Sequence, residues 1–189
     1  MKGDPANLMK RRDEFLLAVG PEVGWLLHAL SVGRRARRIL ELGTSYGYST
    51  LFLAEAARQT GGKVYTIDLS ADKQLHARGQ IEAAALGAQV EWLRGDAIAL
   101  LKTLDGPFDV VLLDLWKDQY VACFELFHEK LADNAVIVAD NMLFPEVVRA
   151  DAAAYRAAVK AKRNLQSVLL PIGNGIELSC VWTRDPHLP

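Results

Sequence analysis

The chain has 189 residues, which is enough for one domain with a full hydrophobic core. Hydrophobic residues make up 51% of the chain, charged residues make up 24%, and the formal net charge is −1. This is the balance of an ordinary globular protein, and it gives no general electrostatic attraction to nucleic acid or to a membrane. No apolar run approaches the ~18 residues that span a bilayer, and no signal peptide precedes the first predicted helix, so we expect a cytoplasmic protein.

The cysteines and histidines lack the spacing of a disulfide framework or a zinc site. Cys123 and Cys180 lie far apart in the sequence. Both fall in apolar segments, and we therefore expect both to be thiols of the core.

Two helices are predicted within residues 1–36, before the first strand. Residues 5–19 have the periodicity of an amphipathic helix, and Pro21 starts a second helix that Gly33 ends. The apolar faces of these helices could cover an active site, pack on a sheet or form a dimer surface. Periodicity alone does not choose among these roles.

From residue 37 to residue 183, predicted strands alternate with predicted helices. The strands lie near residues 38–42, 63–68, 89–93, 109–113, 135–140, 165–170 and 176–182, and the helices near residues 48–59, 72–87, 97–103, 118–131 and 146–161. This alternation predicts a mostly parallel sheet with helices on both faces. Only residues 171–175 separate the last two strands, so these strands must form an antiparallel hairpin. We therefore predict one α/β domain over residues 1–189, with a Rossmann-like core of seven strands, one of them antiparallel.

A strand, a glycine-rich loop and a helix N-terminus follow one another over residues 38–51, an arrangement that commonly holds nucleotide-like ligands. The spacing from Glu41 to Ser49 is E-x-G-x-x-x-G-x-S, whereas a dinucleotide site has G-x-G-x-x-G. The leading carboxylate suits a cationic ligand end, and Tyr46 and Tyr48 stand where a pyrophosphate needs room. The pattern resembles the first motif of class I methyltransferases that use S-adenosylmethionine. This resemblance implies that Glu41 serves the amino acid end of the cofactor.

Two further carboxylates could contact this cofactor. Asp68 ends the second predicted strand, where it could accept hydrogen bonds from ribose hydroxyls; capping of the next helix is a competing role, although Ser70 suits it better. Asp96 lies in a Gly-Asp-Ala triplet that resembles the adenine-side motif of the same family, and it could bind the adenine amino group, cap the next helix, or do both. The full predicted cofactor site contains Glu41, Gly43, Thr44, Ser45, Tyr48, Ser49, Asp68, Leu69, Gly95, Asp96, Ala97, Asp114 and Trp116.

Three potential metal ligands follow two later strands. Asp114 ends the fourth predicted strand, and Asp140 and Asn141 end the fifth. Neighbouring parallel strands would bring these residues to one edge of the sheet, on the cofactor side. Two carboxylates and an amide oxygen are hard ligands that suit Mg²⁺ with positions left open for water or substrate. Each acid alone could cap a helix or meet solvent, but the three together with Lys117 favour a metal site.

The letters DLWKDQY begin at Asp114, and the letters ADN end at Asn141. Both stretches resemble the metal and base motifs of cation-dependent O-methyltransferases, which include catechol O-methyltransferase and the caffeoyl-CoA O-methyltransferase-like enzymes of plants and bacteria. The resemblance extends from about residue 21 to residue 182. It implies that Asp114, Asp140 and Asn141 bind Mg²⁺ or another divalent cation and that Lys117 is the general base.

Two features depart from the pattern of the mammalian catechol enzymes. Leu115 stands where those enzymes have a histidine, which changes a contact near the cofactor. Residues 167–170 are apolar in the region where those enzymes have an acidic residue beside the second catechol hydroxyl. Strict catechol geometry is therefore not implied.

The predicted reaction transfers a methyl group from S-adenosylmethionine to a hydroxyl of a catechol-like aromatic small molecule. A free lysine has a pKa of about 10.4 and is a poor base at neutral pH. A divalent cation and the cofactor sulfonium should lower the pKa of Lys117, so that it can accept the hydroxyl proton. Chelation of vicinal hydroxyls would aim one oxygen at the methyl group. The resemblance also implies a homodimer, with the N-terminal helices as the expected interface.

Three other functions fit parts of the sequence. The cluster of Arg34, Arg35, Arg37 and Arg38 predicts solvated charge beside a helix C-terminus, but a nucleic-acid patch is the alternative, and some bacterial relatives methylate hydroxylated uridine in transfer RNA. A nicotinamide-dependent oxidoreductase would use a similar sheet, yet its third glycine is missing here. A non-catalytic cofactor-binding or scaffold protein would have no need of Lys117 beside a metal site.

Overall fold

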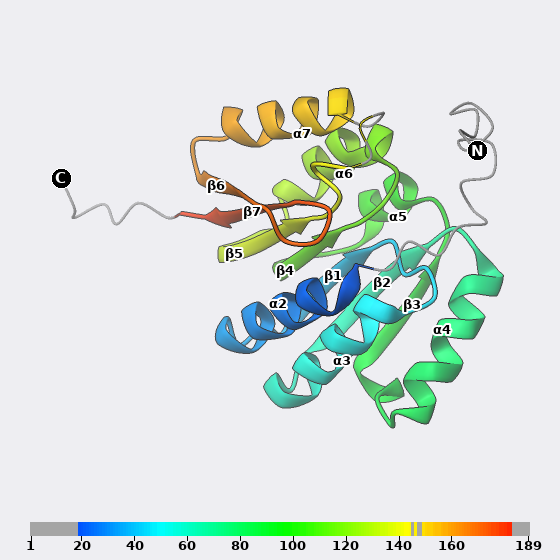
Figure 1. The fold of residues 1–189 in the computed structure, drawn as a ribbon. Helices are drawn as coiled ribbons and strands as arrows, with labels where there is room; N and C mark the ends of the chain where they lie inside the picture. Colours follow the sequence, from blue (N-terminus) through cyan, green and yellow to red (C-terminus); the bar gives the residue numbers. More distant parts are fainter. Residues whose placement is uncertain (1–18, 145, 147–148, 183–189) are drawn as a thin grey trace, which may run out of the picture.

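The computed structural model describes residues 19–144, 146 and 149–182, and these residues form one seven-stranded sheet flanked by helices (Figure 1). The strands are β1 Arg38–Leu42, β2 Lys63–Asp68, β3 Val90–Arg94, β4 Phe108–Leu113, β5 Leu131–Ala139, β6 Leu165–Leu170 and β7 Ile176–Val181. The helices are α2 Gly20–Gly33, α3 Tyr48–Thr60, α4 Ala71–Ala83, α5 Ala97–Thr103, α6 Tyr120–His128 and α7 Arg149–Ala161. None of the helices in these ranges is long and apolar enough to cross a membrane.

The strand order is β3-β2-β1-β4-β5-β7-β6. The pairs among β1 to β5 are all parallel, whereas β7 is antiparallel to both β5 and β6. The predicted α/β fold with one antiparallel strand is therefore confirmed. From β1 the sheet grows through β2 and β3 on one side and through β4 and β5 on the other. The strand order therefore switches between β1 and β4, and open α/β sheets bind ligands at the carboxyl ends of the strands beside such a switch point.

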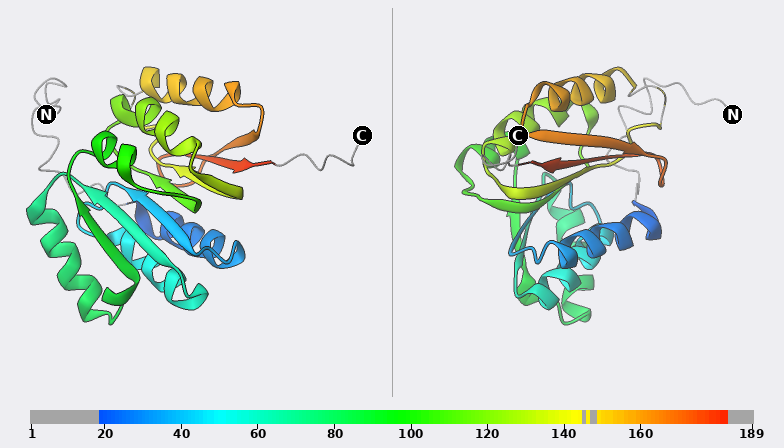
Figure 2. Two further views of the ribbon diagram at one scale, coloured as in Figure 1. Left: turned by 180° about the vertical axis from the view of Figure 1, so that it is seen from behind. Right: turned by 90° about the vertical axis from the view of Figure 1, so that its left-hand side faces the viewer.

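Helices cover both faces of the sheet, with α5, α6 and α7 on one face and α2, α3 and α4 on the other (Figures 1 and 2). Successive residues of β1 show the reason. Leu40 and Leu42 pack with the first helix group, and Ile39 packs with the second. Since side chains alternate across a strand, both faces must be apolar, and this explains the continuous apolar runs in the sequence.

Helix α2 packs on the sheet beside α3, which is one of the three roles left open by its periodicity. Val23 and Leu27 are fully buried in the core cluster that contains Leu53 of α3. Gly24 permits this packing, because a Cβ there would lie 2.6 Å from the ring of Phe52. The other predicted N-terminal helix, at residues 5–19, lies outside the described residues except for Val19.

Some predicted boundaries were wrong. The helix predicted at residues 118–131 is a 3-10 turn at Lys117–Gln119 followed by α6, which ends at His128. Strand β5 starts already at Leu131, because that residue pairs with Phe108 of β4 before a shift in register. The expectation for Cys180 was also wrong: it is exposed, since Val181 and not Cys180 faces the core, whereas Cys123 is buried as expected.

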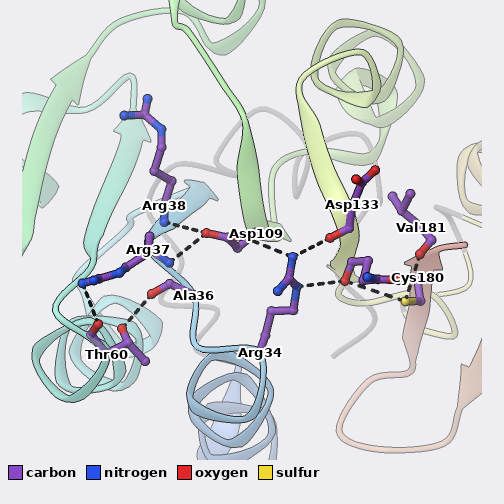
Figure 3. A network of polar contacts seen from close by, with 10 residues as sticks. Arg34, Ala36, Arg37, Arg38, Thr60, Asp109, Asp133, Cys180 and Val181 are labelled. Atoms are coloured by element: carbon purple, nitrogen blue, oxygen red, sulfur yellow. Dashed lines mark hydrogen bonds and ion pairs between the residues drawn. The ribbon is translucent and has the colours of Figure 1, made fainter. Parts of the chain in front are cut away.

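The arginines after α2 lie at the amino ends of the strands, around Asp109 at the start of β4 (Figure 3). The Oδ2 atom of Asp109 accepts the backbone N–H groups of Arg37 at 2.8 Å and Arg38 at 3.0 Å, and Oδ1 lies 3.5 Å from Nη2 of Arg34. Three guanidinium groups donate to protein oxygens: Arg34 to the carbonyls of Asp133 and Asn134, Arg37 to those of Thr60 and Gly61, and Arg38 to the carbonyl of Asp105 and the hydroxyl of Tyr65. The prediction of simply solvated charge was therefore wrong for Arg34 and Arg38, which are half-buried.

Replacement of Asp109 by alanine is expected to lower the free energy of unfolding by about 1–3 kcal/mol, because two backbone donors and Arg34 lose their acceptor. Urea denaturation of the purified protein measures this. The matched control is Asp105→Ala, since Asp105 receives Arg38 through its backbone carbonyl and its side chain is exposed. Equal stability of the two variants would contradict the structural role of the Asp109 carboxylate.

Candidate active site

The ends of β1, β4 and β5 lie side by side and carry the predicted site residues. The N–H of Asp114 donates to the carbonyl of Leu42 at 2.9 Å, and the N–H of Asp140 donates to the carbonyl of Leu113 at 3.1 Å. These bonds continue the parallel ladders by one residue beyond each strand. Asp114 and Asp140 are thus brought to the carboxyl edge of the sheet, beside the glycine-rich loop that follows β1.

Asp114 and Asp140 are close enough to perturb one another. Burial, and then the charge of Asp140, raise the pKa of Asp114 to about 7. Burial raises the pKa of Asp140 to about 6, although the N–H of Asn141 donates to its Oδ1 at 2.7 Å. Asn141 has a φ of 53°, a left-handed conformation that asparagine tolerates and that ends the strand. Two partly repelling carboxylates beside an amide suit a bound divalent cation, which would favour their ionised forms.

The candidate metal set is small. Within the described ranges, no group of three or more histidine, cysteine, aspartate or glutamate side chains gathers as a metal site. The set therefore depends on the amide oxygen of Asn141 as its third protein ligand. A Mg²⁺ ion tolerates this, because it commonly takes one or two carboxylates and leaves several positions to water or substrate.

Lys117 lies in the turn between β4 and α6, and only 6% of its surface is exposed. Its Nζ donates to the hydroxyl of Tyr120 at 2.5 Å, to the carbonyl of Leu115 at 3.3 Å and to Oδ1 of Asn141 at 3.4 Å. Burial lowers the pKa of Lys117, whereas the charges of Asp114 and Asp140 oppose this change. The structure thus brings the predicted base together with the predicted ligands.

The glycine-rich loop lies directly against Asp114. Gly43 has a φ of 104°, and a Cβ on it would lie 2.2 Å from the carbonyl oxygen of Asp114. Gly47 has a φ of 84° and stands at the N-cap of α3, where no side chain caps the helix. Both positions require glycine. The uncapped first turn of α3 therefore offers backbone N–H groups to an anionic group of a ligand.

Glu41 is fully buried beneath this loop and does not face a ligand directly. It accepts hydrogen bonds from the hydroxyls of Ser49 at 2.6 Å, Thr50 at 2.6 Å and Thr66 at 2.5 Å. Since the single hydroxyl proton of Ser49 is donated to Glu41, the Ser49 oxygen can offer only lone pairs to a ligand. Glu41 therefore acts on the loop by orienting Ser49.

Glu41 also gives the stability of the protein a defined pH dependence. Burial raises its pKa from 4.5 to about 7, so the folded protein retains a proton that the unfolded chain releases. The associated stabilisation is complete below pH 4.5 and is lost as the pH rises through about 7. For the protein without cofactor or metal, we expect this contribution to fall by about 2–3 kcal/mol between pH 5 and pH 8.

Urea denaturation of wild type and of Glu41→Gln at pH 5 and pH 8 measures this contribution. Glutamine does not titrate, so the variant should lose less stability than wild type over this interval. Asp114 and Asp140 titrate in both proteins, and the charge of Glu41 is the smallest of the causes that raise the pKa of Asp114, so the difference between the two proteins reports mainly the titration of Glu41. Equal losses would contradict the raised pKa of Glu41.

Asp68 and Asp96 both bind backbone N–H groups of the protein. Asp68 accepts from the N–H of Ser45 at 2.7 Å and from that of Ser70 at 2.8 Å, and thereby fastens the glycine-rich loop to the end of β2. Ser70, not Asp68, caps α4, through its bond from the N–H of Lys73. Asp96 caps α5, and its contact with adenine stays a prediction.

The remaining predicted cofactor residues differ in exposure. Leu69, which follows Asp68, is strongly exposed, and Tyr48 and Trp116 are partly exposed. Thr44 and Ala97 are buried. The N–H of Gly95 donates to the carbonyl of Asp68 and joins the ends of β2 and β3.

The segment after Asn141 rests on the turn between β6 and β7. The N–H of Met142 donates to the carbonyl of Gly175, and that of Leu143 donates to the carbonyl of Asn174, both at 2.9 Å. This support leaves two large apolar side chains exposed near the candidate ligands: Leu143 at 48% and Phe144 at 62%. They are available to contact an apolar substrate.

The sequence did not predict a role in the site for Thr50, Thr66 or Tyr120, although Tyr120 is the last residue of the DLWKDQY stretch. The hydroxyls of the two threonines, one on α3 and one on β2, donate hydrogen bonds to Glu41. Nothing in the sequence around either threonine indicates this contact. Tyr120 does carry a signal, since it follows Lys117 by three residues, a spacing at which side chains of one helical turn meet.

Comparisons with known proteins identify the family of this chain. A family model described as a methyltransferase domain matches residues 40–142. The catechol O-methyltransferase of Mycobacterium tuberculosis is 35% identical over 151 residues, which cover 79% of this chain and 68% of that protein. The structure of the O-methyltransferase TomG from Streptomyces achromogenes, in complex with SAM, has a TM-score of 0.82 at 29% identity and covers 96% of this chain and 92% of that chain.

Fungal relatives are longer. The O-methyltransferase hkm8 of Aspergillus hancockii is 31% identical over 135 residues, which are 70% of this chain but 53% of that protein. The chain thus spans about half the length of this relative. The family match nevertheless includes the end of β1, the glycine-rich loop and the candidate ligands Asp114, Asp140 and Asn141. The chain therefore belongs to the methyltransferase domain family and, within it, is similar to catechol O-methyltransferases.

Proposed function

We propose that this protein is a Mg²⁺-dependent O-methyltransferase that transfers a methyl group from S-adenosylmethionine to one of two vicinal hydroxyls on a catechol-like aromatic molecule. The observation that carries the proposal is Lys117, a nearly buried amine beside Asn141, Asp140 and Asp114 at the edge of the sheet where the glycine-rich loop lies. The names of the relatives support methyl transfer to oxygen.

The cofactor would lie across the ends of β1 and β2. Its carboxylate suits the uncapped first turn of α3, and its ammonium suits the lone pairs of Ser49, because the Ser49 hydroxyl donates its hydrogen bond to Glu41. Its ribose suits Asp68, whose two oxygens are held by the N–H groups of Ser45 and Ser70 but retain lone pairs.

Asp114, Asp140 and Asn141 would hold the divalent cation. When bound, the cation supplies positive charge that lowers the pKa of a substrate hydroxyl. Lys117 accepts the proton of that hydroxyl at Nζ. S-adenosylmethionine, when bound, would supply the methyl group: the methyl carbon would pass from the sulfonium sulfur to the hydroxyl oxygen, which would give a methyl ether and S-adenosylhomocysteine. Leu143 and Phe144 would contact the aromatic ring of the acceptor and exclude water.

A panel of matched acceptors tests the substrate class. Aromatic compounds with vicinal hydroxyls should be methylated, and the same compounds with one hydroxyl removed should react at least about tenfold more slowly, since one hydroxyl gives weaker chelation and poorer orientation. Equal rates for both sets would contradict the vicinal-hydroxyl requirement.

A tRNA methyltransferase is less well supported. The arginine cluster was the one sequence feature that favoured it, yet Arg34, Arg37 and Arg38 donate to protein oxygens at the edge of the sheet opposite the site.

A small aromatic acceptor, a cytoplasmic location and a homodimer remain parts of the proposal. Light scattering during size-exclusion chromatography measures the oligomeric state.

A further inference from the structure

Tyr120 joins the predicted base to both strands that carry the candidate metal ligands. It is fully buried at the start of α6. Its hydroxyl lies 2.8 Å from the carbonyl oxygen of Leu113, which precedes Asp114, and 3.1 Å from the carbonyl oxygen of Asp140. The same hydroxyl lies 2.5 Å from Nζ of Lys117.

The chemistry of the hydroxyl fixes the direction of these hydrogen bonds. A tyrosine hydroxyl has one proton, and the carbonyl oxygens of Leu113 and Asp140 can only accept it. Toward Lys117 the Tyr120 oxygen must therefore accept. An N–H group of Lys117 therefore donates to the Tyr120 oxygen, and the backbone at the ends of β4 and β5 holds that oxygen in place.

The other contacts of the Lys117 amine are longer. Leu115 O and Asn141 Oδ1 lie at 3.3 and 3.4 Å, near the limit for a hydrogen bond. The amine also lies 4.1 Å from the centroid of the Tyr120 ring. Lysine has four rotatable side-chain bonds, so without a short contact its amine would sample several positions. Tyr120 supplies that short contact.

We propose that Tyr120 is a positioning residue, whose hydroxyl holds the Lys117 amine in line with the hydroxyl of the methyl acceptor. This inference rests on the proposed function, because it concerns the base of that reaction. It assigns the role to the hydroxyl and not to the ring, which packs edge to face on Tyr155 at 5.5 Å between centroids. A small displacement of a base is costly, since a misplacement of about 1 Å lowers rates by about 10²-fold.

The variant Tyr120→Phe removes the hydroxyl and keeps the ring. We expect kcat to fall by about 10–100-fold, while KM for S-adenosylmethionine and the cation concentration for half-maximal rate change by less than about threefold. Rates are expressed per cofactor site, counted by binding of S-adenosylhomocysteine, so that partial unfolding does not imitate the effect. A wild-type kcat in Tyr120→Phe would overturn the inference.

Tyr155→Phe is the matched control. Tyr155 is also fully buried and contacts the ring of Tyr120, but its hydroxyl has no hydrogen-bond partner among the described residues. Its loss should leave kcat within about twofold of wild type. An equal fall of kcat in both variants would assign the effect to the aromatic packing and would overturn the role of the Tyr120 hydroxyl.

A double-mutant cycle tests whether Tyr120 acts through Lys117. The variant Lys117→Met/Tyr120→Phe should have the same kcat as Lys117→Met alone, because no base remains to be positioned. Additive losses would overturn the inference. A crystal structure of Tyr120→Phe is an independent test. The Lys117 amine should have moved away from its position beside Asn141, and an unmoved amine would overturn the inference.

The outcomes also separate this inference from the proposed function. If Lys117→Met retains the wild-type rate, the proposed base is wrong and Tyr120 has nothing to position. If Lys117→Met is inactive and Tyr120→Phe is normal, the proposed function stands and only the role of Tyr120 fails.

Discussion

Replacement of Lys117 by methionine is expected to lower kcat by about 10²–10⁴-fold, the usual contribution of a general base. Methionine fills a similar volume in a site where Lys117 is only 6% exposed, but it cannot accept a proton. Cofactor binding should persist, because Glu41, Ser49 and Asp68 lie on other elements. Steady-state methyl transfer and calorimetric binding of S-adenosylhomocysteine measure the two effects separately.

The control for this substitution is Lys102→Met, which removes an exposed lysine from the last turn of α5. Its kcat should equal that of wild type. If Lys117→Met also keeps the wild-type kcat, the buried amine is not the base, and proton transfer must be assigned to water or to the acceptor itself.

Replacement of Asp140 by asparagine should produce the second large effect. The side-chain volume is retained and one of the two carboxylates is lost, so the affinity for a divalent cation should fall. We expect the methylation rate at fixed Mg²⁺ to drop by at least about 10²-fold, because the charge that lowers the pKa of the acceptor hydroxyl is held less often. A titration of the rate against Mg²⁺ measures the loss.

The stability of the same variant without metal shows whether the lower rate comes from loss of metal binding or from loss of folding. The lost Asp140 charge no longer raises the pKa of Asp114, so the metal-free variant should be at least as stable as wild type near neutral pH. Asp151→Asn, which changes an exposed carboxylate of α7, is the control for removal of one negative charge. An unchanged Mg²⁺ dependence in Asp140→Asn would remove Asp140 from the ligand set.

The sheet could be predicted from the sequence because its physical causes are local. The central strands are short, mostly apolar runs, and the hairpin between β6 and β7 follows from a loop too short for a crossover. The ends of helices and strands were less well predicted. For example, the start of β5 depends on the pairing of Leu131 with Phe108, and the sequence near Leu131 does not indicate that contact.

The candidate site shows the same division. Asp114, Asp140 and Asn141 follow adjacent parallel strands, so topology alone brings them together. The environment of Glu41 could not be predicted, because its three hydroxyl partners come from two other elements. The contacts of Arg34 with Asp133 and Asn134 also join residues about one hundred positions apart, and charge patterning carries no information on such contacts.

One assay tests most directly whether the protein transfers methyl groups to oxygen and requires a divalent cation to do so. The protein is incubated with methyl-labelled S-adenosylmethionine and a panel of catechols and caffeoyl esters, with Mg²⁺ or with a chelator. We predict labelled methyl ethers in the presence of Mg²⁺, and loss of the product with chelator that is reversed by excess Mg²⁺. Full activity in the presence of chelator would contradict the assignment of Asp114, Asp140 and Asn141 as a metal site.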